Sequence, residues 1–494
     1  MTLSRALPAT LLLPLFILLV GADEGSAGTT TMAPAIEVAY SDGGMVTVDE
    51  AASSDDGGTA VAEVTDGGVL PGLVPPVPVP SREADPPIAR LRSLAPKQDV
   101  LARAKRDAQG RLVVPGPNGN VPLTIDPTLQ SQLKGLLEQY QVPYGAVVVL
   151  EPSTGRVLAM SEHSQAQPGL RGLATRAVFP AASVFKIVTG SALLEAGVTP
   201  LDETCFHGGK RRLSEKLLAD SERDGQCHSL AEAMGKSANV VFAKLTQRYL
   251  SPGALKHAAA RFHFNREISF PVPTDVSLAS VPDSDEFRFA QTGAGFGDVY
   301  LSPLHGALLA AVAANKGVWK DPVLFEPDPN AQSQSQSQPA EQVLSPEVAR
   351  DLTTLMEATV TKGTARRIFR ERGMGVPGAV GKTGTLADRK PFRDYSWFVG
   401  FAPKDNPKVA VAAVIVNEPL WRIRATWLGR EAMRLGLARL PPGSLAPAKE
   451  DPSAPHEEEP TEEEPSDEET PVEEVAGSPA PHAPAATKTA TTGP

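Results

Sequence analysis

The stretch PAASVFKIVTGSALLEAG, residues 180–197, places Ser183 and Lys186 three positions apart in an otherwise apolar run. The pattern predicts a helix that starts at a proline and stops at Gly197. Residues three apart share a helical face, so Lys186 is expected to lie beside Ser183. Burying an unpaired ammonium is unfavourable. We therefore expect Lys186 to be mostly neutral near neutral pH and able to accept the Ser183 proton.

The S-x-x-K spacing alone is weak evidence, because ordinary residue frequencies predict roughly one chance copy in a chain of this length. A second copy is present, from Ser131 to Lys134 in SQLK. It lies on the polar face of a predicted helix and is interpreted as solvated surface. Only the copy at Ser183 is in apolar surroundings near a predicted helix N-terminus, where a developing anion is favoured.

Two further motifs follow Ser183 along the chain. The segment GKSANVVFAK supplies Ser237-x-Asn239, and VGKTGTL supplies Lys382-Thr383-Gly384-Thr385. With these motifs in this order, the sequence resembles the penicillin-binding transpeptidase family, serine acyltransferases that share their fold with serine β-lactamases.

The resemblance covers residues 110–440. The segments LTIDPTLQ, AVVVLEPSTGRVLAM, GFGDVYLSPLHGALLAAVAANKG, KGTA and WFVGFAPKDNPKVAV are similar to family landmarks in the usual order. It implies an α/β (α+β) fold, with an antiparallel five-stranded sheet flanked by helices. Because the sequence has neither a preceding glycosyltransferase domain nor a following repeat domain, a monofunctional member is expected.

The resemblance also implies a role for each motif residue. Ser183 would be the nucleophile, Lys186 its base, and Ser237 a proton relay towards the leaving amine. Asn239 would bind the substrate backbone, and the terminal carboxylate would be bound by Lys382, Thr383 and Thr385. Gly384 would give the acyl chain close access, and the N–H groups of Ser183 and Thr385 would form the oxyanion hole.

No cofactor or metal is implied. Five histidines show no metal-ligand spacing and are interpreted as structural: His207, His228, His257, His263 and His305. Asp298 and Tyr300, in a loop before a predicted helix at 303–316, receive no role.

The function implied by this resemblance is a peptidoglycan D,D-transpeptidase that forms a serine acyl-enzyme with the D-Ala-D-Ala end of stem peptides. β-Lactams would then be covalent inhibitors. A D,D-carboxypeptidase and a β-lactamase on the same fold are alternatives, and a non-catalytic scaffold of the cell-wall machinery is an alternative of another class. The chain has no nucleic-acid motif, and membrane-associated cell-wall machinery is a further candidate partner.

The hydrophobic patterns predict the elements that must position these residues. Strand pairs are expected at 111–126, 146–160 and 396–418, with helices between the second and third pairs. Ser302-Pro303 and Ser345-Pro346 resemble helix starts, with a capping serine and a proline in the first turn. Early strands, a helical middle and late strands indicate one antiparallel sheet completed from both chain ends.

The two chain ends differ in composition from the middle. Residues 1–22 hold one arginine and an apolar run, which predicts a cleaved signal peptide or a retained membrane anchor. Residues 23–109 are interpreted as a Pro-rich, mostly disordered linker, and 441–494 as an acidic Pro/Glu-rich disordered tail. The tail has 13 acidic residues against Lys449 and Lys488, whereas residues 110–440 have 37 basic and 31 acidic residues. The net charge of −11 therefore says nothing about the middle domain's partners.

Cys205 and Cys227 are the only cysteines. Both an N-terminal signal and an anchor imply export to the periplasm or the outer face of the membrane, where disulfides persist. We therefore expect a bridge between them, with two free thiols as the alternative.

Overall fold

A computed structural model describes residues 88, 91–209, 213–327, 341–389, 391–419, 422–441 and 444. The predicted signal or anchor at 1–22, the Ser/Gln run at 332–338 and nearly all of the tail from 441 lie outside the described residues. Within the described ranges, no helix is both long and apolar enough to span a bilayer.

The central element is an antiparallel sheet of five strands, in the order β13-β14-β15-β4-β5. The strands are β4 (Tyr144–Leu150), β5 (Val157–His163), β13 (Val380–Arg389), β14 (Phe392–Ala402) and β15 (Val409–Asn417). β4 pairs directly with β15, more than 250 residues later in the chain, with Val147 opposite Ala413. The predicted completion of one sheet from both ends of the domain is confirmed, as are the hairpins at 146–160 and 396–418.

Both faces of the sheet are buried. Along β15, Val409, Val411, Ala413 and Ile415 face one apolar core, and the alternate residues face the other. The first core also contains apolar residues of α2 (Pro127–Gln139) and α11 (Ala425–Leu437). The second contains α8 (Pro303–Ala314), which packs against β4, β14 and β15.

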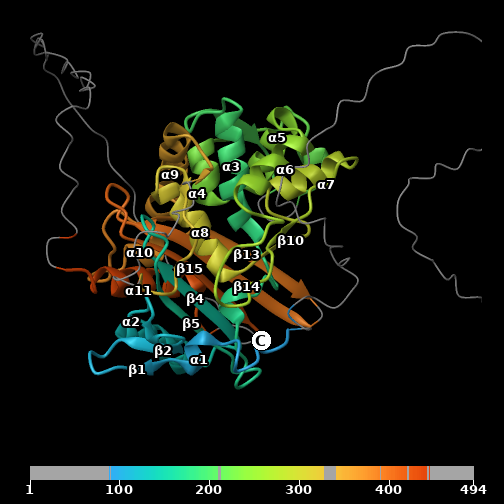
Figure 1. Ribbon diagram of the computed structural model, residues 1–494. Coiled ribbons are helices and arrows are strands. Elements are labelled where there is room, and N and C mark those ends of the chain that lie inside the picture. Colours follow the sequence, from blue (N-terminus) through green and yellow to red (C-terminus); the bar gives the residue numbers. More distant parts are fainter. Residues whose placement is uncertain are drawn as a thin grey trace, which may run out of the picture. The chain divides into compact units, whose positions relative to one another are not determined.

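The remaining helices form a group beyond α8, on the same side of the sheet (Figure 1). They are α3 (Lys186–Glu195), α4 (Leu230–Lys236), α5 (Asn239–Tyr249), α6 (Pro252–Arg261), α7 (Glu286–Gly293) and α9 (Pro346–Thr361). As predicted, Ser302 and Ser345 cap α8 and α9, each accepting a hydrogen bond from a backbone N–H in the first turn.

Short elements complete the described structure. The short helices are α1 (Val100–Arg103) and α10 (Arg366–Phe369), with 3-10 turns η2 (Leu173–Thr175), η3 (Ala182–Phe185) and η4 (Glu215–Leu217). The minor strands are β1 (Lys105–Arg106), β2 (Leu112–Gly116), β3 (Gly119–Pro122), β6 (Phe179–Pro180), β7 (Glu203–Phe206), β8 (Gln226–Ser229), β9 (Leu278–Ala279), β10 (Val299–Leu301), β11 (Val318–Trp319) and β12 (Glu341–Gln342).

We predicted that the packed domain begins at residue 110, but the structure shows that it begins earlier in the chain. β1 pairs with β2, and Leu94 and Val100 are buried in the same core as the sheet. The Leu94 N–H also donates to the carbonyl of Arg171 at 3.0 Å. Residues 91–109 are therefore part of the domain. Their few apolar residues are widely spaced, so the sequence pattern did not distinguish them from a linker.

Candidate active site

Ser183 lies in the 3-10 turn η3, immediately before α3. This differs from the single helix predicted from Pro180, because Pro180 is in strand β6 and Ala182 has a left-handed φ of 49°. Two hydrogen bonds fix the approach to the turn: Trp397 Nε1 donates to the Pro180 carbonyl at 2.9 Å, and the Ala181 N–H donates to Val299 at 2.8 Å. The serine is thus presented from a turn that is held at its start by the central sheet and by β10.

Lys186 is the first residue of α3 and is fully buried. Its Nζ lies 2.9 Å from Ser183 Oγ, 2.8 Å from Asn239 Oδ1 and within hydrogen-bond distance of the Ala294 carbonyl. No carboxylate of the described residues forms an ion pair with it. Two fixed acceptors suit the two N–H groups of a neutral amine, which leaves its lone pair for the Ser183 hydroxyl.

Burial is the main cause that lowers the pKa of Lys186 well below its usual value, and the positive charge of Lys382 lowers it further. The effect of burial was expected from the sequence. A lysine with such a lowered pKa can act as a base near neutral pH.

Lys382 lies on β13 and is also fully buried. Its Nζ donates to Ser237 Oγ at 3.0 Å and to the Thr383 carbonyl at 2.7 Å. Burial lowers the pKa of Lys382 to about 7. The structure thus brings together Lys382 and Ser237, which are 145 positions apart in the sequence.

The Ser237-x-Asn239 segment is the junction between α4 and α5. Ser237 has a left-handed φ of 54° and ends α4, while Asn239 is the first residue of α5. This sharp turn points one polar side chain at each buried lysine: Ser237 at Lys382, and Asn239 at Lys186. The contact of Asn239 with Lys186 was not predicted, and its role towards a substrate stays a prediction.

The strand residues after Lys382 border the Ser183 turn. A Cβ atom on Gly384 would lie 3.2 Å from the Ala181 carbonyl oxygen and from Val184 Cγ2, so this glycine lets β13 approach the turn closely. The predicted role of Gly384, close access for an acyl chain, stays a prediction. Thr385 is exposed, and Thr383 is half-buried with its hydroxyl against that of Thr364.

Sequence reasoning missed two contributors to this site. The Ala294 carbonyl lies in the segment GAGFG, where Gly295 has a φ of 87° and a Cβ would be 2.4 Å from the Ala182 carbonyl oxygen. Thr364 lies in KGTA, and its N–H donates to the Gly235 carbonyl at 3.0 Å. KGTA was noted only as a landmark, and Ala294 lies one residue before another landmark, although alternating glycines are a signal of close backbone approach.

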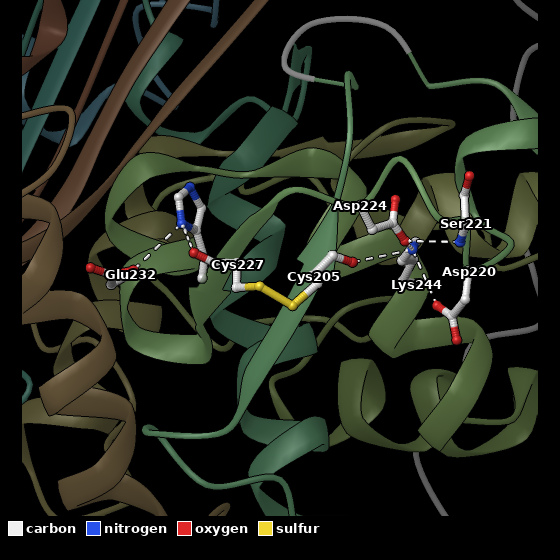
Figure 2. The surroundings of a disulfide bond; sticks show 8 residues. Cys205, Asp220, Ser221, Asp224, Cys227, Glu232 and Lys244 are labelled. Carbon is white, nitrogen blue, oxygen red and sulfur yellow. Dashed lines mark hydrogen bonds and ion pairs between the residues drawn. A yellow bond between two sulfur atoms is a disulfide. The ribbon is translucent and has the colours of Figure 1, made fainter.

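The expected disulfide is present, between directly opposed residues of β7 and β8 (Figure 2). The carbonyl of Cys205 accepts a hydrogen bond from the buried Lys244 on α5 at 3.2 Å. Lys244 also pairs with Asp220 at 3.2 Å and with Asp224 at 2.6 Å. The bridged hairpin is thus tied to the helix that begins with Asn239.

The comparisons with known proteins agree with this geometry. Residues 145–427 match the family described as penicillin binding protein transpeptidase domain. The chain is 31% identical over 340 residues to peptidoglycan D,D-transpeptidase PbpA of Mycobacterium tuberculosis, covering 60% of this chain and 67% of the relative. It is 32% identical over 352 residues to PbpA of Mycolicibacterium smegmatis, covering 62% and 69%.

Among solved structures, penicillin-binding protein A from M. tuberculosis as an imipenem acyl-enzyme complex is 28% identical, with a TM-score of 0.53. The match covers 64% of this chain and 79% of that chain. The penicillin G acyl-enzyme complex of the same protein is 27% identical, with a TM-score of 0.51. The chain described here therefore belongs to the penicillin-binding protein transpeptidase family.

Proposed function

We propose that this protein is a peptidoglycan D,D-transpeptidase that works through an acyl-enzyme on Ser183. The observation that carries the proposal is the contact of 2.9 Å between Ser183 Oγ and the Nζ of Lys186, a fully buried lysine without a carboxylate partner among the described residues. Such a lysine can remove the serine proton near neutral pH. The relatives named D,D-transpeptidase and the β-lactam acyl-enzymes of a similar protein support this function.

In the first half-reaction, Lys186 takes the proton of Ser183, and Oγ attacks the carbonyl carbon of the penultimate D-Ala of a stem peptide. The N–H groups of Ser183 and Thr385 would stabilise the oxyanion, and removing one such donor costs on the order of 3 kcal/mol in other enzymes. The C–N bond then breaks, and the proton held by Lys186 is relayed through Ser237 to the leaving D-Ala amine. The products are free D-Ala and a Ser183 ester.

In the second half-reaction, an amine of another stem peptide attacks the ester carbonyl. A new amide bond forms, the C–Oγ bond breaks, and the proton lost by the amine returns to Ser183. Until D-Ala leaves, Lys382, Thr383 and Thr385 would bind the terminal carboxylate of the donor, and Asn239 would bind the donor backbone. No cofactor takes part in this scheme.

The decisive test is mass spectrometry of the protein after exposure to penicillin. We expect one adduct, on Ser183, because the lactam carbonyl takes the position of the scissile peptide carbonyl. Ser183→Ala should abolish the adduct, whereas Ser131→Ala in the other S-x-x-K copy should leave it unchanged. An adduct elsewhere, or none on folded protein, would reject the proposal and favour a non-catalytic scaffold.

The fate of the acyl-enzyme distinguishes the alternatives on the same fold. Rapid hydrolysis of the penicilloyl ester would indicate a β-lactamase. With a D-Ala-D-Ala peptide, release of D-Ala without a cross-linked product in the presence of an acceptor amine would indicate a D,D-carboxypeptidase. A persistent penicilloyl ester together with a cross-linked dimer is the result expected for a transpeptidase.

The proposed substrate requires the domain to work outside the cytoplasm, and a signal or anchor at residues 1–22 would deliver it there. A retained anchor would keep it beside membrane-associated cell-wall machinery. N-terminal sequencing of the exported protein separates the two cases. A start near residue 23 indicates cleavage, and the intact N-terminus indicates an anchor.

A further inference from the structure

Five exposed cations follow one another on the segment KGTARRIFRER after α9, which starts next to the candidate site and continues into α10. We call them the cationic surface; they are Lys362, Arg366, Arg367, Arg370 and Arg372. Within the described part of the chain, none of them forms an ion pair with a carboxylate. The one acidic residue among them, Glu371, is paired with Arg430 of α11.

Like charges held this close repel one another, and an anion that binds them relieves the repulsion. Some exposed cations elsewhere on the domain are paired with a carboxylate, as Lys256 is with Asp283 at 2.5 Å. The cationic surface therefore fits a partner that carries many negative charges along a short length.

The chain itself contains such a partner. Residues 457–474 hold 11 aspartates and glutamates and neither lysine nor arginine. The net charge of the tail is concentrated in this segment, since the rest of the tail has only two acidic and two basic residues. An intramolecular contact of this kind needs little intrinsic affinity, because the two parts belong to one molecule.

The chain between α11 and the acidic segment is also long enough for this contact. Helix α10 packs against α11 (Figure 1), where Arg430 donates to the Ile368 carbonyl at 2.8 Å. Leu437, the last residue of α11, is about 10 Å along the helix from Arg430, at a rise of ~1.5 Å per residue. From Ser444 to Glu457 the chain can span up to about 45 Å when extended. The acidic segment can therefore reach the cationic surface.

We propose that residues 457–474 bind the cationic surface. The surface begins two residues before Thr364, whose hydroxyl contacts Thr383 on β13. The binding does not depend on the proposed function.

The binding test measures how tightly a free peptide of natural sequence 457–474 binds a variant of the full chain. In this variant, the 11 acidic residues of 457–474 are changed to Gln or Asn. We expect the peptide to bind at about 0.01 M ionic strength and to be released at about 1 M, where the Debye length falls from ~30 Å to ~3 Å. Arg366→Gln, Arg367→Gln and Arg370→Gln together should weaken binding by about tenfold or more.

The matched control removes three exposed cations elsewhere, by Lys134→Gln, Arg288→Gln and Arg350→Gln, with the same change in net charge. It should leave peptide binding nearly unchanged. Equal weakening by both triple variants would show attraction to net charge only and overturn the proposal. Absence of peptide binding would overturn it as well, and binding of vesicles with anionic lipid instead would assign the surface to a membrane.

Discussion

Two Ser-x-x-Lys pairs with identical spacing differ in nearly every physical respect. In α2, Ser131 is exposed and the Lys134 side chain is 57% exposed, 3.6 Å from Glu138. In the site, Lys186 is fully buried and contacts Ser183. The spacing brings two side chains to one face in either case, but only burial without a counter-charge makes a lysine a base near neutral pH.

A third lysine shows that burial alone is not sufficient. The Lys244 side chain is 1% exposed, yet its Nζ points at the carboxylates of Asp220 and Asp224 (Figure 2). Those carboxylates provide the counter-charge that stabilises an ammonium, so Lys244 forms a structural ion-pair network. Lys186 and Lys382 instead face neutral acceptors, and Lys186 also faces the charge of Lys382.

The largest effect is expected from Lys186→Arg. Arginine keeps a long cation but does not release its proton at physiological pH, so the base is lost while the positive charge remains. Acylation of Ser183 by a β-lactam should slow by about 10²–10⁴-fold, the usual contribution of general base catalysis. Single-turnover kinetics measure this directly, and a near-natural rate would mean that the base lies elsewhere.

The comparison also shows what could be predicted from the sequence. The strand pairs, the serine caps of α8 and α9 and the Ser183–Lys186 contact follow from residue type and local spacing, and each was predicted. Asn239 was included in the site, but its contact with Lys186 was not, because that contact depends on the turn between α4 and α5.

Other features depended on contacts that residue identity does not encode. The Ala294 carbonyl is a backbone acceptor, so any residue could supply it, and only the fold brings it to Lys186. The segment 91–109 is held by a few separated contacts of Leu94 and Val100 rather than by a periodic pattern. Gly384 was identified, but its contact with the Ser183 turn was not, because that turn and β13 are nearly 200 residues apart.

The next largest effect concerns the Lys244 region. Replacing both Cys205 and Cys227 by serine should lower the free energy of unfolding by about 3 kcal/mol, the chain-entropy estimate for a loop of this length. Penicillin labelling of Ser183 in the folded variant should stay within a few-fold of natural, because the bridge does not touch Ser183 or either site lysine. Thiol titration of the denatured natural protein checks the bridge itself, and two reactive thiols would reject it.

A smaller effect is expected in the pH profile of acylation. Lys382 must be charged to attract a carboxylate, so the second-order rate should fall by up to about tenfold per pH unit above its pKa of about 7. At lower pH the rate should fall again as Lys186 becomes protonated, which gives a bell shape. Lys382→Arg should remove the alkaline limb because arginine stays charged. Identical alkaline limbs in both proteins would assign that limb to another group.

The smallest effect is expected from Lys134→Met, in the exposed copy of the motif. Its ion pair with Glu138 has the i,i+4 spacing of a surface helix pair, so its removal should cost about 0.2–0.5 kcal/mol of stability. The rate of Ser183 acylation should not change, since Lys134 is solvated and belongs to the opposite face of the sheet from the site helices. Denaturant unfolding and single-turnover acylation measure the two quantities on the same sample. A clear loss of acylation with unchanged stability would mean that the Ser-x-x-Lys spacing contributes to acylation even where the lysine is exposed. Burial of the lysine would then not be what separates the two Ser-x-x-Lys pairs.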